Sequence, residues 1–141
     1  MVRTHKYGEL RTAPVHQAAA PSQGNTMIWE KTDKEMVYVP AGGFLYAEAK
    51  EERELPEFWI DKTPVTNAEY ARFVADANHA PPAHWKGKTP PQEKADHPVT
   101  YVSWHDARAY CEWLTGAWRA AGRIRADEVA RLPTVVGWAG W

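Results

Sequence analysis

Two helix-start signals, one on each side of a proline-dense stretch, constrain the fold of this chain more than any other feature. Thr66 with Glu69 forms the first signal, and Ser103 with Asp106 forms the second. In such a capping box, the two side chains each accept a backbone N–H group that has no partner within the helix. The spacing therefore predicts two helices that begin directly after Thr66 and Ser103.

Apolar side chains recur at three- and four-residue spacing behind both signals. A stripe of this kind is typical of a helix that buries one face. We expect the first helix to end at about Ala77, and the second to end at Gly122, with Gly116 as an alternative earlier end. The stripe residues are Tyr70, Phe73, Val74 and Ala77 in the first helix, and Ala107, Tyr110, Cys111 and Leu114 in the second, which Trp113 and Trp118 flank.

The segment 78–98 between the helices contains five prolines and Gly87. Proline removes a backbone donor and restricts the residue before it, so regular elements are excluded over most of this length. A long loop within a compact domain is often functional. We expect Trp85 to attach this loop to the body of the domain.

Short extended segments surround the helices. They are predicted at 36–40, 44–46, 58–62 and 99–102, and residues 126–133 are expected to lead into a last one. The charged residues of 48–54 are interpreted as a solvated loop. Two helices with several short strands and long loops indicate an α+β fold rather than a βαβ series.

Length and composition indicate one globular domain behind a tail. The polar, proline-punctuated residues 1–26 predict a flexible N-terminal tail, and residues 27–141 predict the domain. Eight tryptophans are unusual for 141 residues. Packing of these rings in the core is favoured over an exposed ligand platform.

Charge and cysteine content exclude several function classes. The net charge is −1 and no basic stripe is present, so nucleic-acid binding is not expected. We find no apolar run long enough to span a membrane and no signal peptide. Cys111 is the single cysteine, which excludes an intrachain disulfide and is compatible with a cytoplasmic location.

Four segments, in their order and spacing, resemble the formylglycine-generating-enzyme-like domain, also called the sulfatase-modifying-factor domain. The second and third of them carry the specificity of the match. The segments are Met36–Phe44 (MVYVPAGGF), Phe58–Phe73 (FWIDKTPVTNAEYARF), His97–Trp113 (HPVTYVSWHDARAYCEW) and Arg131–Thr134 (RLPT).

The resemblance implies a variant of the C-type-lectin fold, with two helices packed on short twisted strands. It also implies that this chain holds only the N-terminal half of a bacterial-type domain. The family's catalytic cysteine pair, copper site and calcium sites belong to the other half. After Thr134 the sequence departs from the family pattern, and Ala47 replaces a usual glycine. We therefore expect an incomplete domain, truncated after this segment, without cofactors.

No complete catalytic constellation is found in the sequence. Cys111 lies on the apolar face of the second helix and is interpreted as a small buried hydrophobe. His79 and His84 lack the spacing of a zinc pair. Asp106 is explained by helix capping, and Asp61 is expected to hold the turn that follows it. No catalytic, cofactor-binding or metal residue is assigned.

Three functions remain open. The first is a non-catalytic binding module for a protein, peptide or glycan ligand, because variable loops on a rigid scaffold commonly bind partners. Its candidate surface comprises His84, Trp85, Lys86, Trp138 and Trp141. The second is part of a copper-dependent formylglycine-generating oxidase, or of a related enzyme, that needs the other half. The third is a truncated remnant that self-associates through uncovered surface.

Overall fold

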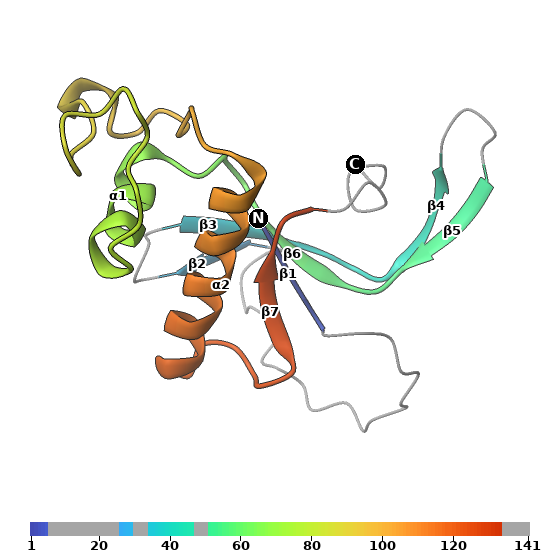
Figure 1. Cartoon of the computed structure of the whole chain (residues 1–141). Helices are drawn as coiled ribbons and strands as arrows, with labels where there is room; N and C mark the ends of the chain where they lie inside the picture. The colour runs from blue at the N-terminus through green and yellow to red at the C-terminus, as the bar shows by residue number, and fades with distance from the viewer. Residues whose placement is uncertain (6–25, 30–33, 47–50, 134–141) are drawn as a thin grey trace.

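A computed structural model describes residues 1–5, 26–29, 34–46 and 51–133 (Figure 1). The predicted α+β class, with two helices and short antiparallel strands, is confirmed, as the C-type-lectin-like architecture requires. The elements are β1 (Val2–His5), β2 (Thr26–Trp29), β3 (Lys34–Val39), β4 (Gly42–Tyr46), β5 (Glu51–Leu55), β6 (Phe58–Asp61), α1 (Asn67–Asp76), the 3-10 helix η1 (Gln92–Lys94), α2 (Trp104–Ala120) and β7 (Glu128–Arg131).

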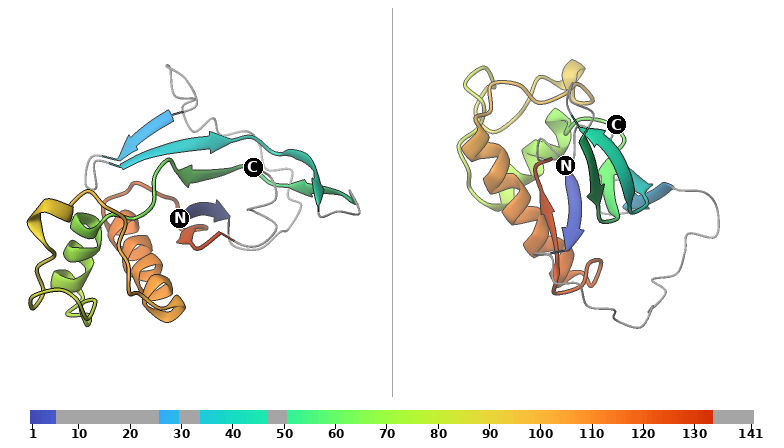
Figure 2. Two further views of the ribbon diagram at one scale, coloured as in Figure 1. Left: turned by 90° about the horizontal axis from the view of Figure 1, so that it is seen from above. Right: turned by 90° about the vertical axis from the view of Figure 1, so that its right-hand side faces the viewer.

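Five of the strands form one antiparallel sheet in the order β2-β3-β6-β1-β7. Both α-helices lie against the same face of this sheet, as the two further views show (Figure 2). The remaining pair, β4 and β5, forms a separate two-stranded sheet that extends to one side (Figure 1).

Strand β1 corrects the predicted tail at its start. Val2 pairs with Ile60 of β6 and with Arg131 of β7, so β1 is an inner strand of the sheet. The composition that predicts a tail lies mainly beyond residue 11 and carries no information about residues 2–5. The rest of the predicted tail, except Thr26 in β2, lies outside the described residues.

Both predicted capping boxes are present. At α1, the Thr66 hydroxyl accepts the Glu69 N–H at 3.3 Å, and the Glu69 carboxylate accepts the Thr66 N–H at 2.7 Å. At the C-terminal end of α2, Gly122 has a φ of 67° and follows the last helical turn. Its N–H donates to the Arg119 carbonyl, and the Arg123 N–H donates to the Trp118 carbonyl. This pattern is a Schellman motif, which ends the helix at the predicted glycine.

The core lies between the two helices and the sheet. Tyr70 of α1 and Tyr110 of α2 stack with ring centroids 5.8 Å apart, and Phe73 meets Tyr110 edge-on at 5.6 Å. Aromatic pairs of this kind add to the free energy gained by burial alone. The largest fully buried side chains are Trp118, Tyr70, Phe73, Met36, Leu114 and Val74.

Two predicted segments are wrong. The charged segment 48–54 is not all loop, since residues 51–55 form β5 and pair with β4. Segment 99–102 is not a strand, because Tyr101 has a φ of 59°, which breaks an extended backbone. The alternation of apolar residues that is typical of strands misleads in both cases. Strand β5 lacks this alternation but has β4 as a partner, whereas 99–102 shows it but has no partner strand among the described residues.

Helix α2 also covers the outer edge of β7. The Thr115 hydroxyl lies 3.0 Å from the Ala130 nitrogen and 3.2 Å from the Ala130 oxygen. Arg119 donates to the Glu128 carbonyl at 3.0 Å. A covered edge resists unwanted strand pairing. In the part of the chain that the structure describes, no helix has the length and apolar character needed to cross a membrane.

Candidate ligand-binding surface

The start of α2 is tied to the loop that follows α1. Asp106 accepts the Ser103 N–H at 2.8 Å and the Ser103 hydroxyl at 2.7 Å, and its other oxygen lies 2.8 Å from the His79 Nε2 atom. These hydrogen bonds, those to Ser103 first, lower the pKa of Asp106 to about 2. One carboxylate therefore both caps α2 and holds His79, whose ring packs on Phe73 with centroids 4.7 Å apart.

Two large aromatic side chains that lie close to Ser103 in the sequence are exposed to solvent. Tyr101 is 79% exposed and Trp104 is 60% exposed. Tyr101 also has a left-handed backbone, which is uncommon for a bulky residue and clusters at functional sites. Exposed rings held on a fixed backbone form a contact area that loses little entropy when a ligand binds.

Cationic and imidazole side chains surround the two rings. His84 lies against Tyr101 with ring centroids 5.0 Å apart, and the Arg108 guanidinium lies 5.7 Å from the centre of Trp104. His105 meets Trp104 edge-on at 5.1 Å. We call these five residues the aromatic surface. Its chemistry fits a ligand that offers an apolar or ring face together with acceptor or anionic groups.

The predicted binding residues are only partly brought together. His84 and Lys86 are exposed, and His84 belongs to the aromatic surface. Trp85 is a correction, because it is only 6% exposed and lies in the core cluster. Trp138 and Trp141 lie outside the described residues. Sequence reasoning missed Tyr101 and Trp104, although their position next to the Ser103 cap favours exposure over burial.

Trp85 instead fixes the loop from beneath, as predicted. Its ring meets Tyr70 edge-on at 6.1 Å, and its backbone N–H donates to the Pro82 carbonyl at 3.0 Å. Since the neighbouring His84 is exposed, the anchored ring determines where His84 is presented. The loop therefore presents His84 from a rigid support, as a binding surface requires.

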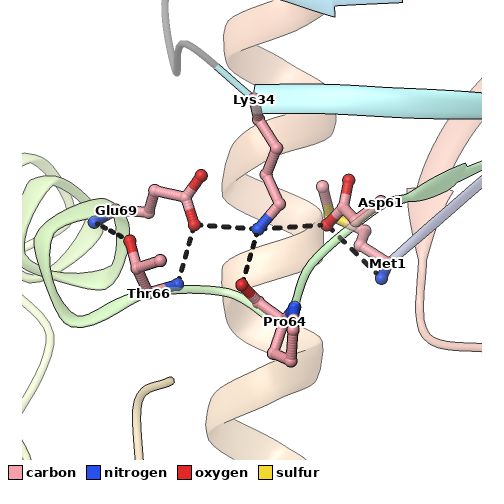
Figure 3. A network of polar contacts seen from close by, with 6 residues as sticks. All are labelled: Met1, Lys34, Asp61, Pro64, Thr66 and Glu69. Atoms are coloured by element: carbon pink, nitrogen blue, oxygen red, sulfur yellow. Dashed lines mark hydrogen bonds and ion pairs between the residues drawn. The ribbon is translucent and has the colours of Figure 1, made fainter. Parts of the chain in front are cut away.

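A buried ion network lies at the N-terminal end of α1 (Figure 3). The Lys34 ammonium is 2.8 Å from the Glu69 carboxylate, 3.0 Å from the Pro64 carbonyl and 3.6 Å from the Asp61 carboxylate. The N-terminal amine of Met1 lies 3.4 Å from the same Asp61 oxygen. Burial raises the pKa of Asp61 despite these cations. The network joins β3, β6 and α1, and sequence reasoning did not detect it.

Comparison with known proteins identifies the family. A family model, described as the sulfatase-modifying factor enzyme 1-like domain, matches residues 23–140. The chain belongs to this family. The match includes all four segments on which the resemblance rests, and it extends past Thr134.

Curated relatives of this family member include enzymes and an inactive protein. Hercynine oxygenase of Mycolicibacterium smegmatis is 29% identical over 111 residues, which cover 60% of this chain and 23% of that protein. Hercynine oxygenase of Mycobacterium tuberculosis is 30% identical, with shares of 60% and 23%. Inactive C-alpha-formylglycine-generating enzyme 2 of Mus musculus is 28% identical, with shares of 57% and 42%. The chain thus spans less than half the length of each relative.

The cysteine of this sulfatase-modifying factor enzyme 1-like domain does not fit the family's thiol chemistry. Cys111 is buried, and burial raises the pKa of its thiol to about 11. A nucleophile or copper ligand requires the thiolate, which this environment disfavours. Cys111 also lines an apolar cavity of about 60 Å³ with Tyr70 and Val102. Its predicted role as a small buried hydrophobe is confirmed.

The described residues of the domain likewise do not fit a metal centre. No group of three or more His, Cys, Asp or Glu side chains within the described ranges is arranged to hold a metal ion.

Proposed function

We propose that this domain is a non-catalytic recognition module that binds its ligand through the aromatic surface. The observation that carries the proposal is the pair of exposed rings, Tyr101 and Trp104, beside the capped start of α2. Tryptophan and tyrosine are enriched among the residues that contribute most to the free energy of binding at protein interfaces.

The support for recognition is the rigidity of the aromatic surface. The Ser103–Asp106 cap and the Asp106–His79 contact hold the start of α2 and the loop after α1 together. Trp85 anchors the same loop in the core. A preorganised surface loses less conformational entropy on binding, so more of the contact energy contributes to affinity.

The support for a non-catalytic role is the environment of Cys111, the one thiol of the chain. Its raised pKa and its place on the inner face of α2 disfavour oxidation or nucleophilic attack. The inactive mouse relative provides a precedent for a family member described as inactive.

The experiment is a screen of the purified chain against peptide and glycan arrays, with three variants alongside. Tyr101→Ala and Trp104→Ala each remove one ring of the aromatic surface. Lys62→Ala is the control, because the Lys62 side chain is 56% exposed and belongs neither to the aromatic surface nor to the β4–β5 sheet. We expect saturable binding that both ring variants lose and the control retains. An array without specific retention, or with retention that survives both ring variants, contradicts the proposal.

A second candidate function is part of a family enzyme that needs further chain. The matches to hercynine oxygenases favour it, since this chain covers 23% of each. The test is incubation of the chain, together with a separately produced C-terminal half of a family member, with copper, air and a peptide that carries a sulfatase-type cysteine, followed by mass spectrometry of the peptide. Formation of a formylglycine product supports this candidate and rejects the non-catalytic role.

A further inference from the structure

Strands β4 and β5 form an arm that continues the main sheet outward (Figure 1). The last pair within the sheet is Val39 with Phe58, and the first pair of the arm is Gly42 with Leu55. The same number of residues separates the two pairs on each strand, so the register is unchanged. The chain from β3 to β6 is therefore one long hairpin whose outer half leaves the body of the molecule.

The base of the arm is shaped by prolines and one aromatic contact. Pro40 and Pro56 lie in the two connections between arm and sheet, where each removes a backbone donor from the ladder. The Tyr38 hydroxyl donates to the Glu57 carboxylate at 2.5 Å, and the Tyr38 ring packs against Trp59 with centroids 5.2 Å apart. The ladder is thus interrupted at a defined point, and side chains stabilise the place where the arm departs.

The arm lacks the coverage that the inner half of the hairpin has. Within the sheet, β2 covers the outer edge of β3, and β1 covers that of β6. No strand among the described residues pairs with the outer edge of β4 or of β5. Leu45 is 60% exposed. An isolated two-stranded hairpin is only marginally stable in water, so a third strand would stabilise the arm.

The two edges of the arm differ in charge. Strand β5 carries three glutamates (Glu51, Glu52 and Glu54) and one arginine, Arg53, which forms an ion pair with Glu51 at 3.0 Å. Charged residues protect an edge strand from pairing, and two arms placed together would bring like charges into contact. Strand β4 (GGFLY) has no charged residue, so its edge is the unprotected one.

The cross-strand pairs of the arm indicate what that edge would bind. Leu45 faces Glu52, and Gly43 faces Glu54, so these four residues share one face of the arm. A strand added beside β4 would contact Leu45 and have two carboxylates within reach of long side chains. Apolar contact combined with negative charge suits a segment that alternates aliphatic and basic residues.

We propose that β4 is a docking edge for an extended, basic segment of a partner protein, which adds to the arm as a third strand. The partner occupies beside β4 the place that β2 occupies beside β3. The carboxylates of β5 attract the basic segment and exclude acidic ones, including a second arm. This interaction is separate from the aromatic surface and does not depend on it.

The test uses a short fluorescent peptide of alternating Lys and Val as the probe, with anisotropy as the readout. Two control peptides accompany it: alternating Glu and Val, and the Lys–Val peptide with alternate backbone nitrogens methylated. The first tests charge, and the second tests main-chain pairing at the same charge. The variants are Glu52→Lys with Glu54→Lys on the arm, and Asp76→Lys with Glu93→Lys as a matched exposed control on the body.

We expect the full chain to bind the Lys–Val peptide only, and the arm variant to lose about tenfold or more in affinity while the body variant is unchanged. Tyr101→Ala should have no effect, which separates this proposal from the proposed function. Equal binding of the methylated peptide, or equal loss in both reversal variants, reduces the interaction to general electrostatics and overturns the proposal. Light scattering that detects a dimer lost in the arm variant assigns the edge to a second copy instead.

Discussion

Replacing Lys34 with methionine should destabilise the domain far more than the same replacement at Lys62. Both ammonium groups lie 2.8 Å from a carboxylate oxygen, Lys34 from Glu69 and Lys62 from Glu35. The side chains of the first pair are 4% and 10% exposed, and those of the second pair are 56% and 38% exposed. The comparison therefore holds the ion-pair distance constant, while Lys34 is far more buried and also contacts the Pro64 carbonyl and the Asp61 carboxylate.

The magnitude follows from the surroundings of Lys34. At 2.8 Å and an effective dielectric constant of about 20, the Lys34–Glu69 attraction is roughly 6 kcal/mol, which desolvation of the two ions largely offsets. Removal of the ammonium leaves that cost without the attraction. Lys34→Met should lose about 3–5 kcal/mol of unfolding free energy. Lys62→Met should lose less than about 1 kcal/mol, because water already solvates the exposed pair.

Urea denaturation followed by tryptophan fluorescence measures both losses, since Trp85 and Trp118 are buried. A third protein, Lys34→Met with Glu69→Gln, removes the unpaired charge and should recover at least about 1 kcal/mol relative to Lys34→Met alone. Equal losses at the two lysines would refute the reasoning from burial. A double variant no more stable than Lys34→Met would refute the assignment of the loss to Glu69.

Three further predictions concern α2. Gly116→Ala should stabilise the domain by about 0.5–1 kcal/mol in thermal melts, because Gly116 is an exposed helix-interior residue with open space where a Cβ would lie. Gly122→Ala should instead destabilise it by about 1 kcal/mol, because the φ of 67° at this position is unfavourable for alanine. If both variants were more stable than wild type, the Schellman motif at the end of α2 would be contradicted. Asp106, whose pKa falls from 3.8 unfolded to about 2 folded, should contribute stability that is lost as pH drops from about 4 to 2. Urea midpoints of wild type and Asp106→Asn should therefore converge over that range, and a constant difference would contradict it.

Local signals predicted the helices well. The boxes at Thr66 and Ser103 act within four residues, and so does the glycine at 122, so neither needs knowledge of the rest of the fold. The buried position of Cys111 likewise followed from helical spacing.

Long-range pairing was the part that the sequence could not predict. Residues 2–5 form an inner strand only because β6 and β7 flank them, and the acidic β5 forms only because β4 lies opposite. The Lys34–Glu69 ion pair joins residues 35 positions apart and has no local pattern. The aromatic surface was only partly predicted. Trp85 is buried and Trp104 is exposed, and no local sequence pattern distinguishes the two tryptophans.

The central claim, that the aromatic surface binds a ligand, is tested most directly by calorimetric titration of one array-selected ligand. The titration compares wild type, Tyr101→Ala, Trp104→Ala and Lys62→Ala, each shown by its thermal melt to be folded. Each ring variant should weaken binding about tenfold or more, since a binding hot spot contributes more than about 1.4 kcal/mol, and Lys62→Ala should bind as wild type does. Unchanged affinity in both ring variants would contradict the account.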